Sequence, residues 1–118
     1  MFRFLQSAKH AINGIFYALR TERNVQIWAA VLVVNLLIAA FLQVTQFEFL
    51  LILIVMFGVG IAEYLNTALE ILSDRVTLER DESIKRVKDV AAAATFIAST
   101  LAVIVSAIIY LPKILNLS

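Results

Sequence analysis

Four polar side chains continue a strongly apolar stretch of the chain and are candidates for catalysis. The segment GIAEYLNTALEILSD, residues 60–74, carries Glu63, Asn66, Glu70 and Asp74. At 100° per residue in a helix, Glu70 and Asp74 lie about 20° to either side of Glu63, and Asn66 lies about 60° away. The four side chains therefore form one stripe. A rise of about 1.5 Å per residue puts Glu63 roughly 10 Å further along the helix into the apolar region than Glu70, so the two carboxylates can have different functions.

A carboxylate inside an apolar segment costs free energy and is more often functional than structural. Further polar groups should meet the stripe at the same depth: Glu22 before the first apolar segment, and Lys88 with Asp89 before the last. Glu22 and Glu70 offer hard oxygen ligands, which suit a Mg²⁺ ion that keeps waters and phosphate oxygens in its shell. The chain has no cysteine and a single histidine, His10, which excludes thiolate and histidine metal sites in practice.

The glycines allow phosphate-binding loops to be checked directly, because there are three of them, Gly14, Gly58 and Gly60. Neither GxxxxGK[ST] nor a complete GxGxxG is present. Any nucleotide must therefore be held through side chains and a metal ion. A formal net charge of +1 is too small to indicate a nucleic-acid surface, so no nucleic-acid partner is expected.

The elements that must position the stripe are apolar helices. Of the 118 residues, 62% are hydrophobic and 16% are charged, and the mean hydropathy is +0.91. Soluble domains average roughly 45–50% apolar and about 25% charged residues, so this composition indicates a membrane protein. A hydrocarbon layer of about 30 Å requires about 20 apolar residues in a helix. The apolar runs predict three spanning helices, at about 26–44, 48–72 and 88–111.

The N-terminal stretch, about residues 2–21, has a different pattern. Apolar residues recur at helical spacing with basic and polar residues largely between them, which predicts an amphipathic helix lying on the membrane surface. We therefore expect one all-α integral membrane domain over residues 1–118, with one surface helix and three spans.

The basic residues predict the orientation of these spans. Nine of the ten lie in the N-terminal stretch or in the charged segment 73–89, and Lys113 lies on the opposite side. By the positive-inside rule, the N-terminus and segment 73–89 face the cytoplasm. Small residues at Gly58, Gly60 and Ala62 offer a face for close helix contact, which favours self-association.

The segment EYLNTALE, residues 63–70, fits the ExxNxAxE signature of the small bacterial membrane lipid kinases, the prokaryotic diacylglycerol kinase and undecaprenol kinase family. The chain also resembles this family through Asp74, through KDVAAAA from Lys88, and back to Glu22 in ALRTERN. The resemblance covers almost the whole chain. It implies Mg²⁺-dependent transfer of phosphate from ATP to a membrane lipid alcohol, in a homotrimer with active sites shared between protomers at the cytoplasmic face of a bacterial membrane.

The resemblance also implies roles for individual residues. Glu63 matches the general base that takes the proton of the lipid hydroxyl, and Asn66 matches a residue that supports it. Arg3 matches a lipid-facing basic position. Glu22 and Glu70 match the acidic groups that hold Mg²⁺–ATP. The remaining positions that match the nucleotide site are Asp74, Glu79, Arg80, Asp81, Lys88, Asp89 and His10, the last standing where many relatives carry tyrosine.

KDVAAAA and RTERN look more like the undecaprenol kinase branch than the diacylglycerol kinase branch. Two other classes of protein remain open from the residues alone. A small proton-coupled transporter also needs a membrane carboxylate, but nearer the midplane than Glu63, which lies toward the basic end of its helix. A structural membrane subunit with charged helix ends would bind no nucleotide.

Overall fold

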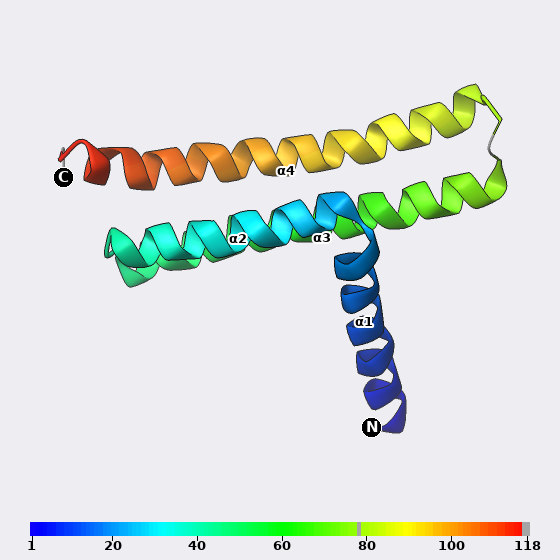
Figure 1. Ribbon diagram of the computed structural model, residues 1–118, viewed down its shortest axis with the longest axis horizontal. Helices are drawn as coiled ribbons and strands as arrows, with labels where there is room; N and C mark the ends of the chain where they lie inside the picture. Colours follow the sequence, from blue (N-terminus) through cyan, green and yellow to red (C-terminus); the bar gives the residue numbers. More distant parts are fainter. Residues whose placement is uncertain (78, 117–118) are drawn as a thin grey trace.

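The structure, a computed structural model, describes residues 1–77 and 79–116, and within them the chain forms four α-helices (Figure 1). These are α1 (Phe2–Thr21), α2 (Arg23–Phe41), α3 (Gln46–Val76) and α4 (Glu82–Ile114). Helices α2, α3 and α4 run along the long axis of the molecule, whereas α1 runs crosswise to them from the start of α2. The all-α prediction is confirmed, and α2, α3 and α4 are each long and apolar enough to cross a membrane.

Helix α3 begins at a well-formed cap. The Thr45 hydroxyl accepts a hydrogen bond from the Glu48 backbone N–H at 3.1 Å, and the Glu48 carboxylate accepts one from the Thr45 N–H at 2.9 Å. This reciprocal pair satisfies two amide groups that have no partner within the helix. From there α3 continues for 31 residues without a break. The apolar run and the polar stripe are therefore one rigid element.

Helix α4 extends beyond the predicted span of 88–111 at both ends. It begins at Glu82, because the Asp81 carboxylate caps it by accepting a hydrogen bond from the Ile84 N–H at 3.0 Å. It ends at Ile114 and contains Pro112 in its last turn. Near this end, the Lys113 ammonium lies 3.1 Å from the Glu48 carboxylate and joins α4 to the start of α3.

The core lies where α2, α3 and α4 meet. Its buried members are Ala39, Ile52, Val55, Met56, Val59, Ala102, Ile109 and Tyr110. The Tyr110 hydroxyl lies within hydrogen-bonding distance of the backbone and side-chain oxygens of Asn35, which is itself buried. This buried polar contact holds α4 against α2 without leaving the hydroxyl unpaired.

The outer faces of the three long helices are apolar and exposed. Examples from each are Leu37 (65% exposed), Ile61 (64%) and Phe96 (74%). Exposed apolar surface of this extent suits contact with lipid chains, and helices are the form in which a single segment satisfies its own backbone in lipid. The fold therefore meets both requirements of a three-span protein.

We expect Tyr110→Phe to lower the free energy of unfolding by about 1 kcal/mol, because the change removes a buried interhelical hydrogen bond and leaves Asn35 short of a donor. Reversible unfolding in mixed micelles with increasing dodecyl sulfate measures this. Thr100→Val is the control, since the Thr100 hydroxyl bonds only within its own helix, to the Phe96 carbonyl. Equal stability of the two variants would contradict a clamp between α2 and α4.

Candidate active site

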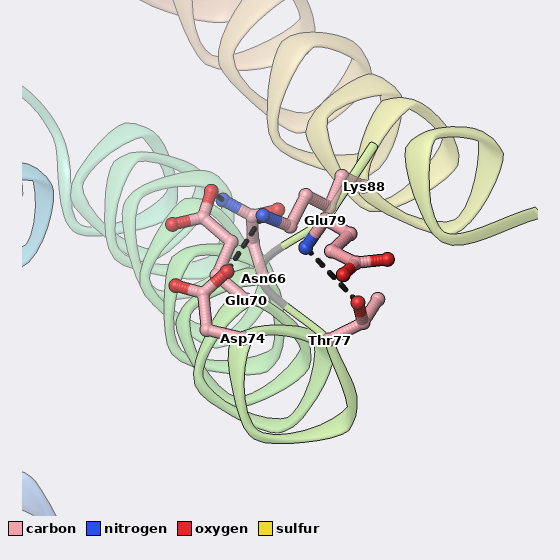
Figure 2. Close-up of polar contacts among 6 residues, drawn as sticks. All are labelled: Asn66, Glu70, Asp74, Thr77, Glu79 and Lys88. Carbon is pink, nitrogen blue, oxygen red and sulfur yellow. Dashed lines mark hydrogen bonds and ion pairs between the residues drawn. The ribbon is translucent and has the colours of Figure 1, made fainter. Parts of the chain in front are cut away.

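Three of the four side chains of the predicted stripe, Asn66, Glu70 and Asp74, lie near one another on α3 (Figure 2). The Asn66 amide donates a hydrogen bond to a carboxylate oxygen of Glu70 at 3.1 Å, one helical turn further on. Asn66 is buried, with 5% of its surface exposed, whereas Glu70 is exposed. The pair thus orients a carboxylate at the edge of the buried region.

Two oxygen atoms of the stripe are buried without a hydrogen-bond donor among the described residues. They are Oε2 of Glu63 and Oδ1 of Asn66. In folded proteins more than about 90% of buried polar groups are paired, so each such atom requires an explanation. Both atoms are acceptors, and each could take a proton donor or a cation. Unsatisfied acceptors at successive turns of one helix are what a binding site for such a group requires.

Glu63 also lines a groove formed by α2, α3 and α4. The groove has a volume of about 390 Å³. Most of its walls are apolar, and its other polar residues are Asn24, Asn35, Ser99 and Ser106. A mostly apolar groove with a few convergent polar groups is the usual form of a small-molecule site. The carboxylate of Glu63 is thus within reach of an apolar molecule that carries a polar group.

Asn66 lines a different groove, on the side of α3 that faces the first half of α4. This groove has a volume of about 630 Å³, and its walls are apolar apart from Asn66 and Arg86. Arg86 is one of the basic residues of segment 73–89 that predict the orientation, and no site role was predicted for it. Arg86 lies three residues before Asp89 and four before Val90, where the charged segment ends and the apolar run begins. This spacing could have indicated a role at the site.

The polar end of the stripe is closed by an ion pair. The Lys88 ammonium reaches from α4 to the Asp74 carboxylate at 2.7 Å, as Figure 2 shows. Both side chains are partly exposed, 40% and 54%. An exposed pair of this kind contributes little stability, roughly 0–1 kcal/mol, so its geometry matters more than its energy.

A polar cavity of about 250 Å³ surrounds this ion pair at the α3–α4 connection. Its lining residues are Asp74, Thr77, Glu79, Arg80, Asp81, Ile84, Lys85 and Lys88. The Glu79 backbone N–H donates a hydrogen bond to the Thr77 hydroxyl at 3.0 Å, which shapes this connection (Figure 2). The structure therefore brings together five of the residues predicted for the nucleotide site: Asp74, Glu79, Arg80, Asp81 and Lys88.

The other predicted residues are placed further apart. Asp89 forms an ion pair with Lys85 at 2.8 Å, one turn back along α4. Glu22 lies at the junction of α1 and α2, where it ends one helix and precedes the next. Arg3 and His10 are exposed on α1, which leads away from the other helices (Figure 1).

The carboxylates are the candidate ligands for a metal ion. No group of three or more aspartate, glutamate, histidine or cysteine residues with metal-binding geometry occurs in residues 1–77 and 79–116. A Mg²⁺ ion that retains waters and binds phosphate needs only one or two protein carboxylates. Glu70 fits that requirement, since it is exposed and held in place by Asn66.

Comparison with known proteins gives consistent matches over nearly the full length. A family model described as prokaryotic diacylglycerol kinase matches residues 9–110. The chain belongs to the prokaryotic diacylglycerol kinase family. The undecaprenol kinase of Bacillus subtilis is 34% identical over 112 residues, which are 95% of this chain and 91% of that protein.

Two relatives named diacylglycerol kinase are similar to the same degree. That of Pseudomonas aeruginosa is 34% identical over 109 residues, 92% of this chain and 89% of that protein. That of Synechocystis is 35% identical over 114 residues, 96% of this chain but 65% of that protein. This prokaryotic diacylglycerol kinase family member is therefore a multi-pass membrane lipid kinase that uses ATP, and similar identities to both kinds of relative do not distinguish its lipid.

For Lys88, which the resemblance predicts at the nucleotide site, we expect Lys88→Met to lower kcat by about a hundredfold, because in that role the change removes a cation beside the transferring phosphoryl group. The free energy of unfolding should change by less than about 1 kcal/mol, since the pair with Asp74 is exposed. Kinase activity and micellar unfolding of the same preparation measure both quantities.

The matched control is Lys113→Met, which removes the lysine of the ion pair at the other end of α4. Its specific activity per folded molecule should stay near that of the wild type. Equal losses of activity in the two variants would show that Lys88 acts only as a structural partner of Asp74.

Proposed function

We propose that this chain transfers the terminal phosphoryl group of ATP to the hydroxyl group of a membrane lipid, with undecaprenol favoured over diacylglycerol. In this reaction the O–H bond of the lipid breaks, a P–O bond forms, and ADP leaves. Glu63 is the general base. The observation that carries the proposal is the buried, unpartnered Oε2 atom of Glu63 beside a largely apolar groove.

The position of Glu63 supports its role as the base. Its free oxygen is an acceptor without a donor, and a lipid hydroxyl would supply the donor. The groove would hold the carbon chain next to that hydroxyl. Proton transfer by a positioned carboxylate typically contributes 10²–10⁴-fold to a rate. Asn66 supports the site from one turn away by holding Glu70.

The polar cavity at the α3–α4 connection supports a nucleotide site. Three cations, Arg80, Lys85 and Lys88, line it beside three carboxylates. In phosphoryl transfer the protein mostly positions the groups and stabilises charge. Lys88 is held by Asp74 at the end of the stripe, so it can meet phosphate oxygens that approach from this side. We assign Glu79, Asp81 and Asp89 to the same site, and His10 and Arg3 to contacts from α1.

Glu22 and Glu70 are the residues that would hold Mg²⁺, which would supply charge neutralisation of the ATP phosphates. The two carboxylates come from the α1–α2 junction and from α3. The enzyme works as a homotrimer, in which Glu22 and Glu70 of different protomers can approach one another. Extensive exposed apolar surface on all three spans supports such association.

The site faces the cytoplasm in this proposal. The residues before the first span and segment 73–89 carry nine of the ten basic residues, which the positive-inside rule assigns to the cytoplasmic side. ATP is made and used on that side of a bacterial membrane. Family membership favours this kinase over the transporter and the structural subunit that the residues alone left open.

Glu63→Gln should lower kcat on either lipid by roughly a hundredfold or more, because glutamine cannot accept the proton. Glu48→Gln is the matched control: it makes the same change on the same helix, and glutamine retains the capping box at that position. Transfer of labelled phosphate from ATP to undecaprenol or diacylglycerol in mixed micelles measures both. Full activity of Glu63→Gln would remove Glu63 as the base.

Glu70→Gln should raise the Mg²⁺ concentration for half-maximal activity by about tenfold or more, because a metal-binding carboxylate is lost. Titration of Mg²⁺ at fixed ATP measures this, and chelation of the metal should abolish activity in the wild type. Glu82→Gln, an exposed acid in the first turn of α4, is the control. A Mg²⁺ dependence that is the same in all three proteins would contradict the role of Glu70.

A further inference from the structure

The indole ring of Trp28 is wedged from α2 against α3, next to the turn that carries Glu63. Its Nε1–H donates a hydrogen bond to the Met56 carbonyl at 2.8 Å. Its edge-to-face contacts with the rings of Phe57 and Tyr64 have centroid separations of 6.0 and 6.2 Å. A ring held by one hydrogen bond and two aromatic neighbours has a fixed orientation. In membrane helices a tryptophan near one end more commonly anchors the helix at the membrane surface.

Gly60 is the residue that makes room for this ring. A Cβ atom placed on Gly60 would overlap the ring atoms Cζ2 and Cε2 of Trp28. Gly58, two residues earlier on the same helix, has nothing within 4 Å of such an atom. The close approach of α2 and α3 at this point therefore depends on a glycine at 60 and not at 58. Any side chain at Gly60 would displace the indole ring.

The same ring forms part of the wall of the groove that leads to Glu63. Trp28 is the largest side chain among the lining residues, whereas α4 contributes the smaller side chains of Ser99, Ala102, Val103 and Ser106. The width of the groove near Glu63 is therefore set by the position of the indole ring. Its orientation is fixed from α3, through Met56 and Gly60, which belong to the same helix as the carboxylate.

We propose that Trp28 determines lipid specificity, by admitting an alcohol carried on one slim chain and hindering an alcohol flanked by two acyl chains. In a polyprenol a single hydrocarbon chain follows the hydroxyl-bearing carbon. In diacylglycerol two ester-linked chains branch within two carbons of the hydroxyl, so the lipid is wide at the depth of the indole ring. This inference rests on the proposed function, because it assigns the groove beside Glu63 to the lipid.

The test compares kcat/KM for undecaprenol and for diacylglycerol in the same mixed micelles. Trp28→Ala should raise the ratio of diacylglycerol to undecaprenol by about tenfold, which is the scale on which pocket size discriminates between apolar groups. The change should arise mainly in KM. Trp28→Phe keeps a ring but loses the hydrogen bond to Met56, so it should shift the ratio by a smaller factor in the same direction.

Gly60→Ala provides a second, independent arm. In the wild-type background it should alter the ratio, because the added methyl group displaces the ring. In the Trp28→Ala background it should have little effect, because the ring is absent. Such non-additivity is the mark of two residues in direct contact. Gly58→Ala is the matched control and should leave the ratio unchanged.

Several outcomes would overturn the inference. One is a ratio of diacylglycerol to undecaprenol activity that Trp28→Ala leaves unchanged. If Trp28→Ala does not fold, an unchanged ratio in both Trp28→Phe and Gly60→Ala has the same meaning. Another is an equal fall for both lipids that follows a loss of thermal stability, which would show a purely structural role. A wild-type chain that phosphorylates neither lipid would instead overturn the proposed function itself, so the two failures are distinguishable.

Discussion

The depth of every site residue depends on the packing of α3 against α4, and an ion pair marks each end of this hairpin. Glu48 pairs with Lys113 at one end and Asp74 with Lys88 at the other. Glu48 and Asp74 are 26 positions apart on α3, which corresponds to about 39 Å of helix. Lys88 and Lys113 are 25 positions apart on α4, which corresponds to about 38 Å. A bilayer with its headgroup layers is about 40–45 Å thick. The two pairs therefore fit the two polar surfaces of one membrane, and they mark the register in which α3 packs against α4.

In this arrangement the side chains of the stripe on α3 lie at different depths in the membrane. Along the helix, Glu70 lies about 6 Å inward from Asp74, near the boundary of the hydrocarbon, and Glu63 lies about 16 Å inward. An uncharged lipid alcohol is not held among the headgroups by charge, so its hydroxyl can reach the depth of Glu63. A triphosphate cannot be moved there without large cost. In the proposed reaction the nucleotide base and ribose stay at the α3–α4 connection. The terminal phosphoryl group extends from there toward Glu63, past Glu70 and Asn66. The hydrogen bond between these two side chains lies on that path.

Much of the fold follows from the sequence because lipid allows few alternatives. Charge-free runs of about 20 residues must be helical in a membrane, and caps such as Thr45 with Glu48 can be recognised from residue type and spacing. The stripe is equally local, since residues 63–74 need only helical geometry to share a face. Contacts between helices are different. Neither the pairing of Tyr110 with Asn35 nor that of Lys88 with Asp74 follows from spacing alone, because each depends on the rotation and separation of packed helices. The contact between Trp28 and Gly60 does not follow from the sequence either. A tryptophan at the membrane surface and a small residue in a membrane helix each have a common role of their own.

The unpartnered oxygens of Glu63 and Asn66 show how stability and function are divided in this chain. The hydrogen bonds and ion pairs that hold the helices together lie at the ends of the hairpin, in the α2–α4 clamp and at Trp28. Between them, α3 keeps two buried acceptors without donors, one beside each groove. An acceptor that is buried and unpaired lowers stability, so it persists only where the surrounding contacts over-determine the fold. Under the proposed function, the free energy lost there is recovered when the lipid hydroxyl or a cation binds to these acceptors.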